Sequence, residues 1–95
     1  MSKTLVRNNT QGSTETVSST EFLSTAYEQI SDISLSLNKD SETDTVLESM
    51  SDILELMKTV LKTLNVKPEH LFSTAQQLNT EEGTFSEMKA VPREQ

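Results

Sequence analysis

Residues Thr45 to Leu64 read TVLESMSDILELMKTVLKTL and form the most regular stretch of this chain. Apolar side chains recur there at steps of three and four residues, which is the period of an α-helix with one buried face. They are Val46, Leu47, Met50, Ile53, Leu54, Met57, Val60, Leu61 and Leu64. Beside them run the carboxylates Glu48, Asp52 and Glu55, whose burial is costly without a compensating cation or donor. The stretch therefore predicts a packing helix with an acidic edge of unknown role.

Two further helices are predicted on either side of this one. The segment 20–38 has the same apolar spacing, and residues 18–21 before it read SSTE, the spacing of a capping box. Residues 45–48 offer a second capping box to the central helix. A third helix is expected over 68–78, with a proline at its first position. Because the connection 38–44 is short and polar, the first two helices should be antiparallel neighbours.

The chain divides into three segments by composition. Residues 1–17 are rich in Ser, Thr, Asn and Gln and predict a flexible polar arm, 18–79 form the helical domain, and 80–95 form a C-terminal tail expected to pack on or near the bundle. The apolar faces are narrow, so one copy would enclose little core. The predicted fold is all-α, a small helical bundle with three main helices, completed by homo-oligomerisation as a dimer or tetramer. A monomeric three-helix bundle is the alternative.

Composition restricts the partners. The chain has 95 residues, a formal net charge of −7 and eight scattered basic residues, a distribution that argues against a nucleic-acid partner. It has no Cys, which removes disulfides and thiolate metal sites. Neither a membrane-spanning run nor a signal peptide is recognisable, so no membrane partner is expected and the predicted location is cytoplasmic.

Two acidic pairs suggest chemistry at the helix faces. Glu28 and Asp32 lie four residues apart on the first predicted helix, and Glu48 and Asp52 lie four apart on the second. Like charges at this spacing share a helix face and repel each other unless something positive lies between them. Because Mg²⁺ prefers converging carboxylate oxygens, facing pairs on antiparallel helices make a conceivable metal site. The alternative is a solvated acidic edge.

Several motifs occur in the order found in one enzyme family. They are LVR at 5–7, the two acidic motifs, NVKPEHL at 65–71 and EEGTFSEMKAV at 81–91. In this order the chain resembles the MazG-like, all-α nucleotide pyrophosphohydrolases, the group that includes phosphoribosyl-ATP pyrophosphohydrolase. The resemblance extends over nearly the whole chain. It implies a bundle of MazG-like type and a Mg²⁺-dependent site for nucleotides.

The metal motifs of that family are incomplete here. The resemblance implies Mg²⁺ ligands at the positions of Gln29, Asp32, Ser49 and Asp52, where the family has four acids. A Gln carbonyl and a Ser hydroxyl are neutral and weak toward Mg²⁺, so half of the anionic ligand set is missing. In a shifted geometry, Glu28 and Glu48, each one residue from an expected ligand position, could take over coordination from Gln29 and Ser49.

The candidate site residues follow from this comparison. Possible metal ligands are Asp32, Asp52, Glu28 and Glu48, although the leading expectation is that no cofactor is bound. Arg7 is the remaining cation of a family motif that normally also contains Lys, and Tyr27 precedes the first acidic motif, so these two are candidates for nucleotide or phosphate contacts. The alternative for Tyr27, which the sequence favours, is a position in the core.

Three functional hypotheses remain open. The leading one is a degenerate MazG-like protein that binds a nucleotide or a protein partner with little or no hydrolysis. The second is an active, divergent Mg²⁺-dependent nucleoside triphosphate pyrophosphohydrolase. The third is an acidic interaction protein of a virus or mobile element.

Overall fold

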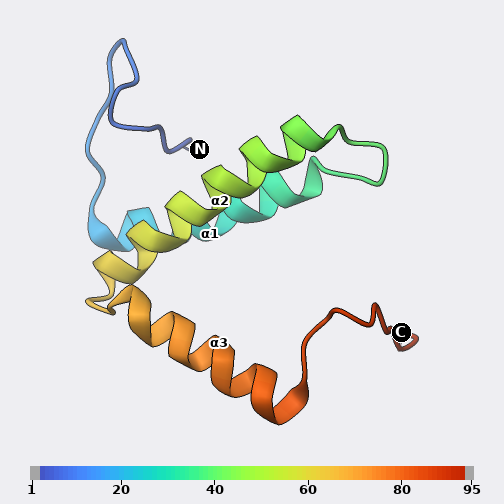
Figure 1. The fold of residues 1–95 in the computed structure, drawn as a ribbon. Helices are drawn as coiled ribbons and strands as arrows, with labels where there is room; N and C mark the ends of the chain where they lie inside the picture. The colour runs from blue at the N-terminus through green and yellow to red at the C-terminus, as the bar shows by residue number, and fades with distance from the viewer. Residues whose placement is uncertain (1–2, 94–95) are drawn as a thin grey trace.

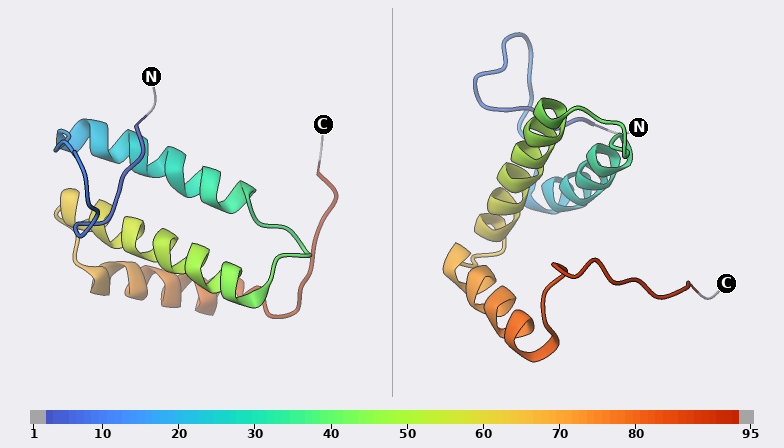
Figure 2. Two further views of the ribbon diagram at one scale, coloured as in Figure 1. Left: turned by 90° about the horizontal axis from the view of Figure 1, so that it is seen from above. Right: turned by 45° about the vertical axis from the view of Figure 1, so that its right-hand side comes forward.

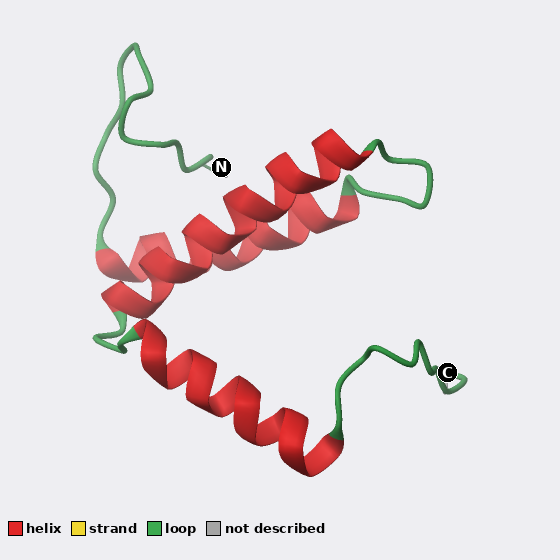
Figure 3. Ribbon diagram, viewed as in Figure 1, coloured by secondary structure: helices red, strands yellow, loops and turns green. Residues whose placement is uncertain are grey.

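The computed structural model describes residues 3–93, and over that range the chain has three helices and no strand (Figure 1, Figure 3). The helices are α1 (Ser19–Leu35), α2 (Thr43–Thr63) and α3 (Pro68–Glu82). The prediction of an all-α protein with three main helices is therefore confirmed. The first two residues of the predicted arm and the last two of the predicted tail lie outside the described residues.

Helix α1 begins at the predicted cap and ends earlier than expected. Ser18 is the N-cap, and its Oγ accepts a hydrogen bond from the Glu21 N–H at 3.1 Å. The predicted helix continued to residue 38, whereas α1 ends at Leu35. The reason lies in the serines of the last turn, because the Ser34 and Ser36 hydroxyls donate to main-chain carbonyls at 2.9 and 2.6 Å and compete with helix propagation.

Helix α2 starts two residues before its predicted capping box. Its N-cap is Glu42, which makes no side-chain capping bond, and the Val46 N–H already donates to the Glu42 carbonyl at 3.0 Å. The capping role predicted for residues 45–48 is therefore wrong. Asp44 in the first turn offers the favourable interaction of a carboxylate with the positive helix end.

The turn between α2 and α3 is a Schellman motif. Asn65 lies in the left-handed region with φ 59°, the Val66 N–H donates to the Leu61 carbonyl at 2.8 Å, and the Asn65 N–H donates to the Lys62 carbonyl at 3.1 Å. Asn is among the few non-glycine residues that tolerate this conformation. Pro68 then opens α3, as predicted.

Helix α3 is longer than predicted, and the tail after it extends into solvent. The sequence predicts an end near residue 78, but the helix continues to Glu82 because residues 79–82 include two glutamates, good helix formers, and Gln77 donates to the Glu81 carboxylate at 3.1 Å. Gly83, with φ 86°, terminates it.

In the described part of the tail, Phe85 and Met88 are more than 90% exposed, so packing on the bundle is not observed. The tail's apolar residues are too scattered to form a packing face.

The core lies between α1 and α2, which run antiparallel side by side (Figure 1, Figure 2). Within residues 3–93 the buried apolar side chains are Ala26 on α1 and Val60 on α2. Helix α3 leaves the end of α2 at an angle, so that α2 and α3 form a V (Figure 1). Large apolar side chains of α2, of its C-cap and of α3 stay exposed, namely Leu47, Met50, Leu54, Met57, Leu64, Phe72 and Leu78.

No helix within residues 3–93 has both the length and the apolar character that crossing a bilayer requires.

Candidate functional site

The N-terminal arm folds back over α1 and α2, and its central contact is a pair of hydrogen bonds between Leu5 and Gln29. The Leu5 N–H donates to Gln29 Oε1 at 2.8 Å, and Gln29 Nε2 donates to the Leu5 carbonyl at 3.0 Å. A side-chain amide can make both bonds because it contains one acceptor and one donor group. The half-buried Gln29 thus pairs with the arm as a neighbouring strand would, and we call this contact the amide clasp.

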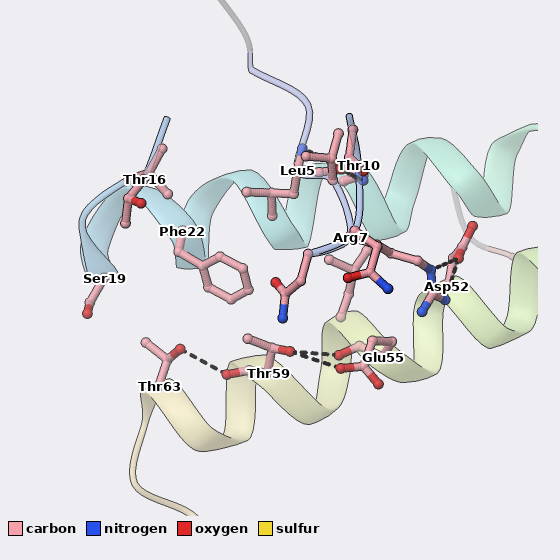
Figure 4. A pocket seen from close by; sticks show the side chains of 16 residues that line it. Leu5, Arg7, Thr10, Thr16, Ser19, Phe22, Asp52, Glu55, Thr59 and Thr63 are labelled. Atoms are coloured by element: carbon pink, nitrogen blue, oxygen red, sulfur yellow. Dashed lines mark hydrogen bonds and ion pairs between the residues drawn. The ribbon is translucent and has the colours of Figure 1, made fainter. Parts of the chain in front are cut away.

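An ion pair fixes the arm next to this clasp. Arg7 Nη2 and Nε donate to the same Asp52 oxygen, Oδ1, at 2.7 and 3.2 Å (Figure 4). The hydrogen bond to Asp52 and its charge raise the pKa of the Arg7 guanidinium above its usual value. Since both side chains are more than half exposed, solvent screens the pair and it contributes little to stability.

A second cation holds the two ends of the arm. The Lys3 ammonium lies 2.5 Å from Glu15 Oε1 in the arm and 2.9 Å from Glu21 Oε2 in α1. These two carboxylates, Glu15 first, raise the pKa of Lys3, and in return the ammonium lowers the pKa of the Glu15 carboxyl. The arm therefore forms a loop that is closed on itself and tied to the start of α1.

A cavity of about 950 Å³ lies between the arm and the two helices (Figure 4). Its described lining comes from the arm, from α1 and from α2: Leu5, Val6, Arg7, Asn8, Asn9, Thr10, Thr16, Val17, Ser19, Phe22, Gln29, Asp52, Glu55, Leu56, Thr59 and Thr63. The charged members of this lining are one cation, Arg7, and the two carboxylates Asp52 and Glu55. The cavity brings Arg7, Asp52 and Gln29 to one place, which makes it the candidate site.

The structure does not bring the predicted metal ligands together. Asp32, Glu28 and Glu48 are exposed on their helices, and no three His, Cys, Asp or Glu side chains of the described chain form a group that could hold a metal ion. Asp52 is hydrogen-bonded to Arg7, and both amide atoms of Gln29 are engaged in the clasp. The residues present therefore do not fit the Mg²⁺ site that the family resemblance implies.

The two predicted nucleotide contacts are separated. Arg7 lines the cavity, whereas Tyr27 is 53% exposed and is not among the lining residues, so it neither fills core nor faces the site.

The residues that the sequence interpretation missed are Phe22, Thr59 and Thr63. Glu55, Thr59 and Thr63 follow each other at steps of four, so their common helix face was readable from the sequence, but the arm that covers them was not.

No protein-family model, no curated protein and no solved structure matches this chain.

Proposed function

We propose that this protein is a degenerate, MazG-like pyrophosphohydrolase-type protein that binds a nucleotide or a protein partner with little or no hydrolysis. The observation that supports this most directly is the use of Gln29 and Asp52. They occupy two of the four positions at which the resembled family has its metal ligands, and here they hold the N-terminal arm through Leu5 and Arg7.

The chemistry of hydrolysis makes this substitution costly. Metal-assisted phosphate hydrolysis needs an ion that activates water and offsets the charge on the phosphates. Of the four positions, Gln29 and Ser49 have no carboxylate, and Asp52 already accepts two hydrogen bonds from Arg7. Arg7 is also the one cation in the described cavity lining, so a bound triphosphate would have to take it from Asp52.

The partner that the exposed surface fits best is a second copy of the chain. The apolar face of α2 that α1 leaves uncovered and the apolar face of α3 are both unpartnered in one copy, with Leu54 56% and Phe72 67% exposed. Burying such faces contributes about 25 cal/mol per Å². We therefore propose a homodimer or tetramer in which these faces of α2 and α3 pack against those of another copy.

The catalytic part of the proposal is tested by a hydrolysis assay. Purified protein is incubated with Mg²⁺ or Mn²⁺ and a panel of nucleoside triphosphates, and pyrophosphate release is measured. Enzymes commonly turn over at roughly 1–1,000 per second, and we expect a rate orders of magnitude lower.

The control is Asp52→Asn, which removes the carboxylate charge and leaves the shape of the side chain. Residual release should be the same in both proteins, since it does not depend on a metal held by Asp52. Ordinary turnover that Asp52→Asn abolishes would instead establish the active, divergent pyrophosphohydrolase.

A second candidate is the acidic interaction protein of a virus or mobile element. It is favoured by Asp32 and Glu48, which are exposed on α1 and α2 and join no cation in a described ion pair. In that case, charge reversal of both residues would weaken capture of a basic protein partner, and added nucleotide would have no effect. Capture that nucleotide blocks would support the leading proposal.

A further inference from the structure

We propose that the cavity under the N-terminal arm is a binding site for a small organic cation, an ammonium or guanidinium compound with a short apolar body. This inference rests on the hydrogen-bonding polarity of the cavity wall and not on the family resemblance; it would exclude a nucleotide from this cavity and leaves the protein-partner form of the function proposed above unaffected. Three features of the wall support it: its acceptors, its charge and its apolar surface.

The α2 side of the cavity presents hydrogen-bond acceptors. Thr63 Oγ1 donates its hydroxyl hydrogen to the Thr59 carbonyl at 2.8 Å, and Thr59 Oγ1 donates to the Glu55 carbonyl at 3.0 Å (Figure 4). A hydroxyl has a single hydrogen, and in both residues that hydrogen is already donated. Each hydroxyl oxygen can therefore only accept a hydrogen bond from a ligand. The ionised carboxylates of Glu55 and Asp52 also accept and cannot donate. A ligand on this wall therefore has to supply the hydrogens.

The charge of the lining favours a cation. Arg7 is matched by Asp52, both of its bonds going to Oδ1, and this contact shows how the wall holds a guanidinium group. Glu55 makes no hydrogen bond to Arg7. Its nearest cation is Lys58, which forms an ion pair with Glu55 Oε1 at 3.7 Å from outside the lining, and the charge of Arg7 also reaches it. Of the charged groups on the described wall, two are negative and one is positive, so an anionic ligand would be repelled.

Part of the remaining wall is apolar, beside polar side chains of the arm such as Asn8, Asn9 and Thr10. Phe22 points from α1 toward the cavity, and Leu5 from the arm lies above it (Figure 4). Leu56 and Val17 complete this side. At about 950 Å³, the cavity is within the range of roughly 300–1,000 Å³ typical of small-molecule sites. A cationic head near Glu55 and Thr59 with an apolar body against Phe22 satisfies both kinds of surface.

The test is an NMR titration of the ¹⁵N-labelled full chain with three compounds of similar shape and different charge. They are phenethylammonium, neutral phenylpropanol and anionic phenylpropionate. We expect phenethylammonium to shift the amide signals of Glu55, Thr59 and Phe22, and to bind about threefold or more tightly than phenylpropanol, with phenylpropionate weakest. Equal affinities for the three compounds, or shifts that avoid the cavity residues, would overturn the proposal.

Variants then assign the contact. Glu55→Gln keeps the shape and removes the charge, and it should lower the affinity for phenethylammonium about threefold or more. Glu48→Gln makes the same change at an exposed position of α2 outside the lining and should leave the affinity unchanged. If both variants behave alike, Glu55 is not the anchor. Thr59→Val removes a hydrogen-bond acceptor at nearly constant shape and should also weaken the binding of phenethylammonium. It tests the contribution of the α2 wall if Glu55→Gln does not fold.

Discussion

At the scale of single residues, the amide of Gln29 decides how the arm is held. A carboxylate at this position would still accept from the Leu5 N–H, but it could not donate to the Leu5 carbonyl and would place two acceptors against each other. A neutral amide is therefore required at this position for the clasp to form.

We predict that Gln29→Glu loosens the arm. It removes the 3.0 Å bond to the Leu5 carbonyl, which should cost about 1 kcal/mol of local stability and raise the hydrogen-exchange rate of the Leu5 amide about fivefold. The matched control is Gln76→Glu, the same change at an exposed position of α3. An unchanged exchange rate at Leu5 in the first variant would show that the clasp is absent in solution.

The Lys3 contact predicts a response to acid. The ammonium lowers the pKa of Glu15 in the folded arm. The contact therefore stabilises the folded arm when the pH is above the ordinary carboxyl pKa near 4.5, and this stabilisation is lost as the pH falls through the lower pKa that Glu15 has in the folded protein. A ¹³C titration of the Glu15 carboxyl should therefore have a midpoint below 4.5. In Lys3→Gln the midpoint should return to the ordinary range; a midpoint that does not move refutes the contact.

At the scale of elements, α1 and α2 form the part of the chain that holds itself together. Ala26 is fully enclosed between them, with no exposed surface, and Val60 is 8% exposed. A small side chain at the closest point lets the two helices approach, and the half-buried Ile and Leu residues around it complete the contact. Helix α3 has no buried residue of its own.

We predict that Ala26→Leu destabilises this helix pair. The added isopropyl group has no space, and overpacking of this kind costs about 1–3 kcal/mol. Urea unfolding followed by circular dichroism measures the change. Ala75→Leu, the same substitution at an exposed position of α3, should alter stability by about 0.5 kcal/mol or less. Equal effects at both positions would mean that Ala26 is not enclosed.

At the scale of the whole molecule, the open V of α2 and α3 is the feature that most needs a partner. A chain of this length buries little surface by itself, and here two large apolar faces add to the exposed area. Association of copies would remove both faces from water at once.

Substitution of these faces should dissociate the assembly. We expect the wild-type chain to be a dimer or tetramer by light scattering after size exclusion, and Leu54→Ser or Phe72→Ser to shift it toward the monomer at the same concentration. Phe85→Ser is the control, because Phe85 lies in the tail and is 96% exposed outside either helix face. A monomeric wild-type chain at high concentration would contradict the proposal.

The sequence predicted the parts of this structure that are encoded locally. The apolar period of 45–64, the Ser18 cap and Pro68 identified three helices, because spacing, capping and a fixed φ act over a few residues. The path of the arm was not predictable, since Leu5 meets Gln29 and Arg7 meets Asp52 across 24 and 45 residues. Because that path was unknown, the sequence pointed to Asp52 and Gln29 as positions of metal ligands and did not predict that they hold the arm.

The order of contacts along the arm has a consequence for its response to ionic strength. Leu5, held by the neutral clasp, lies between Lys3 and Arg7, which are held by exposed ion pairs. The screening length shortens from about 8 Å at physiological salt to about 3 Å at 1 M, so the charged contacts weaken while the amide bonds persist. In concentrated salt the arm should stay attached at its middle and fray on both sides.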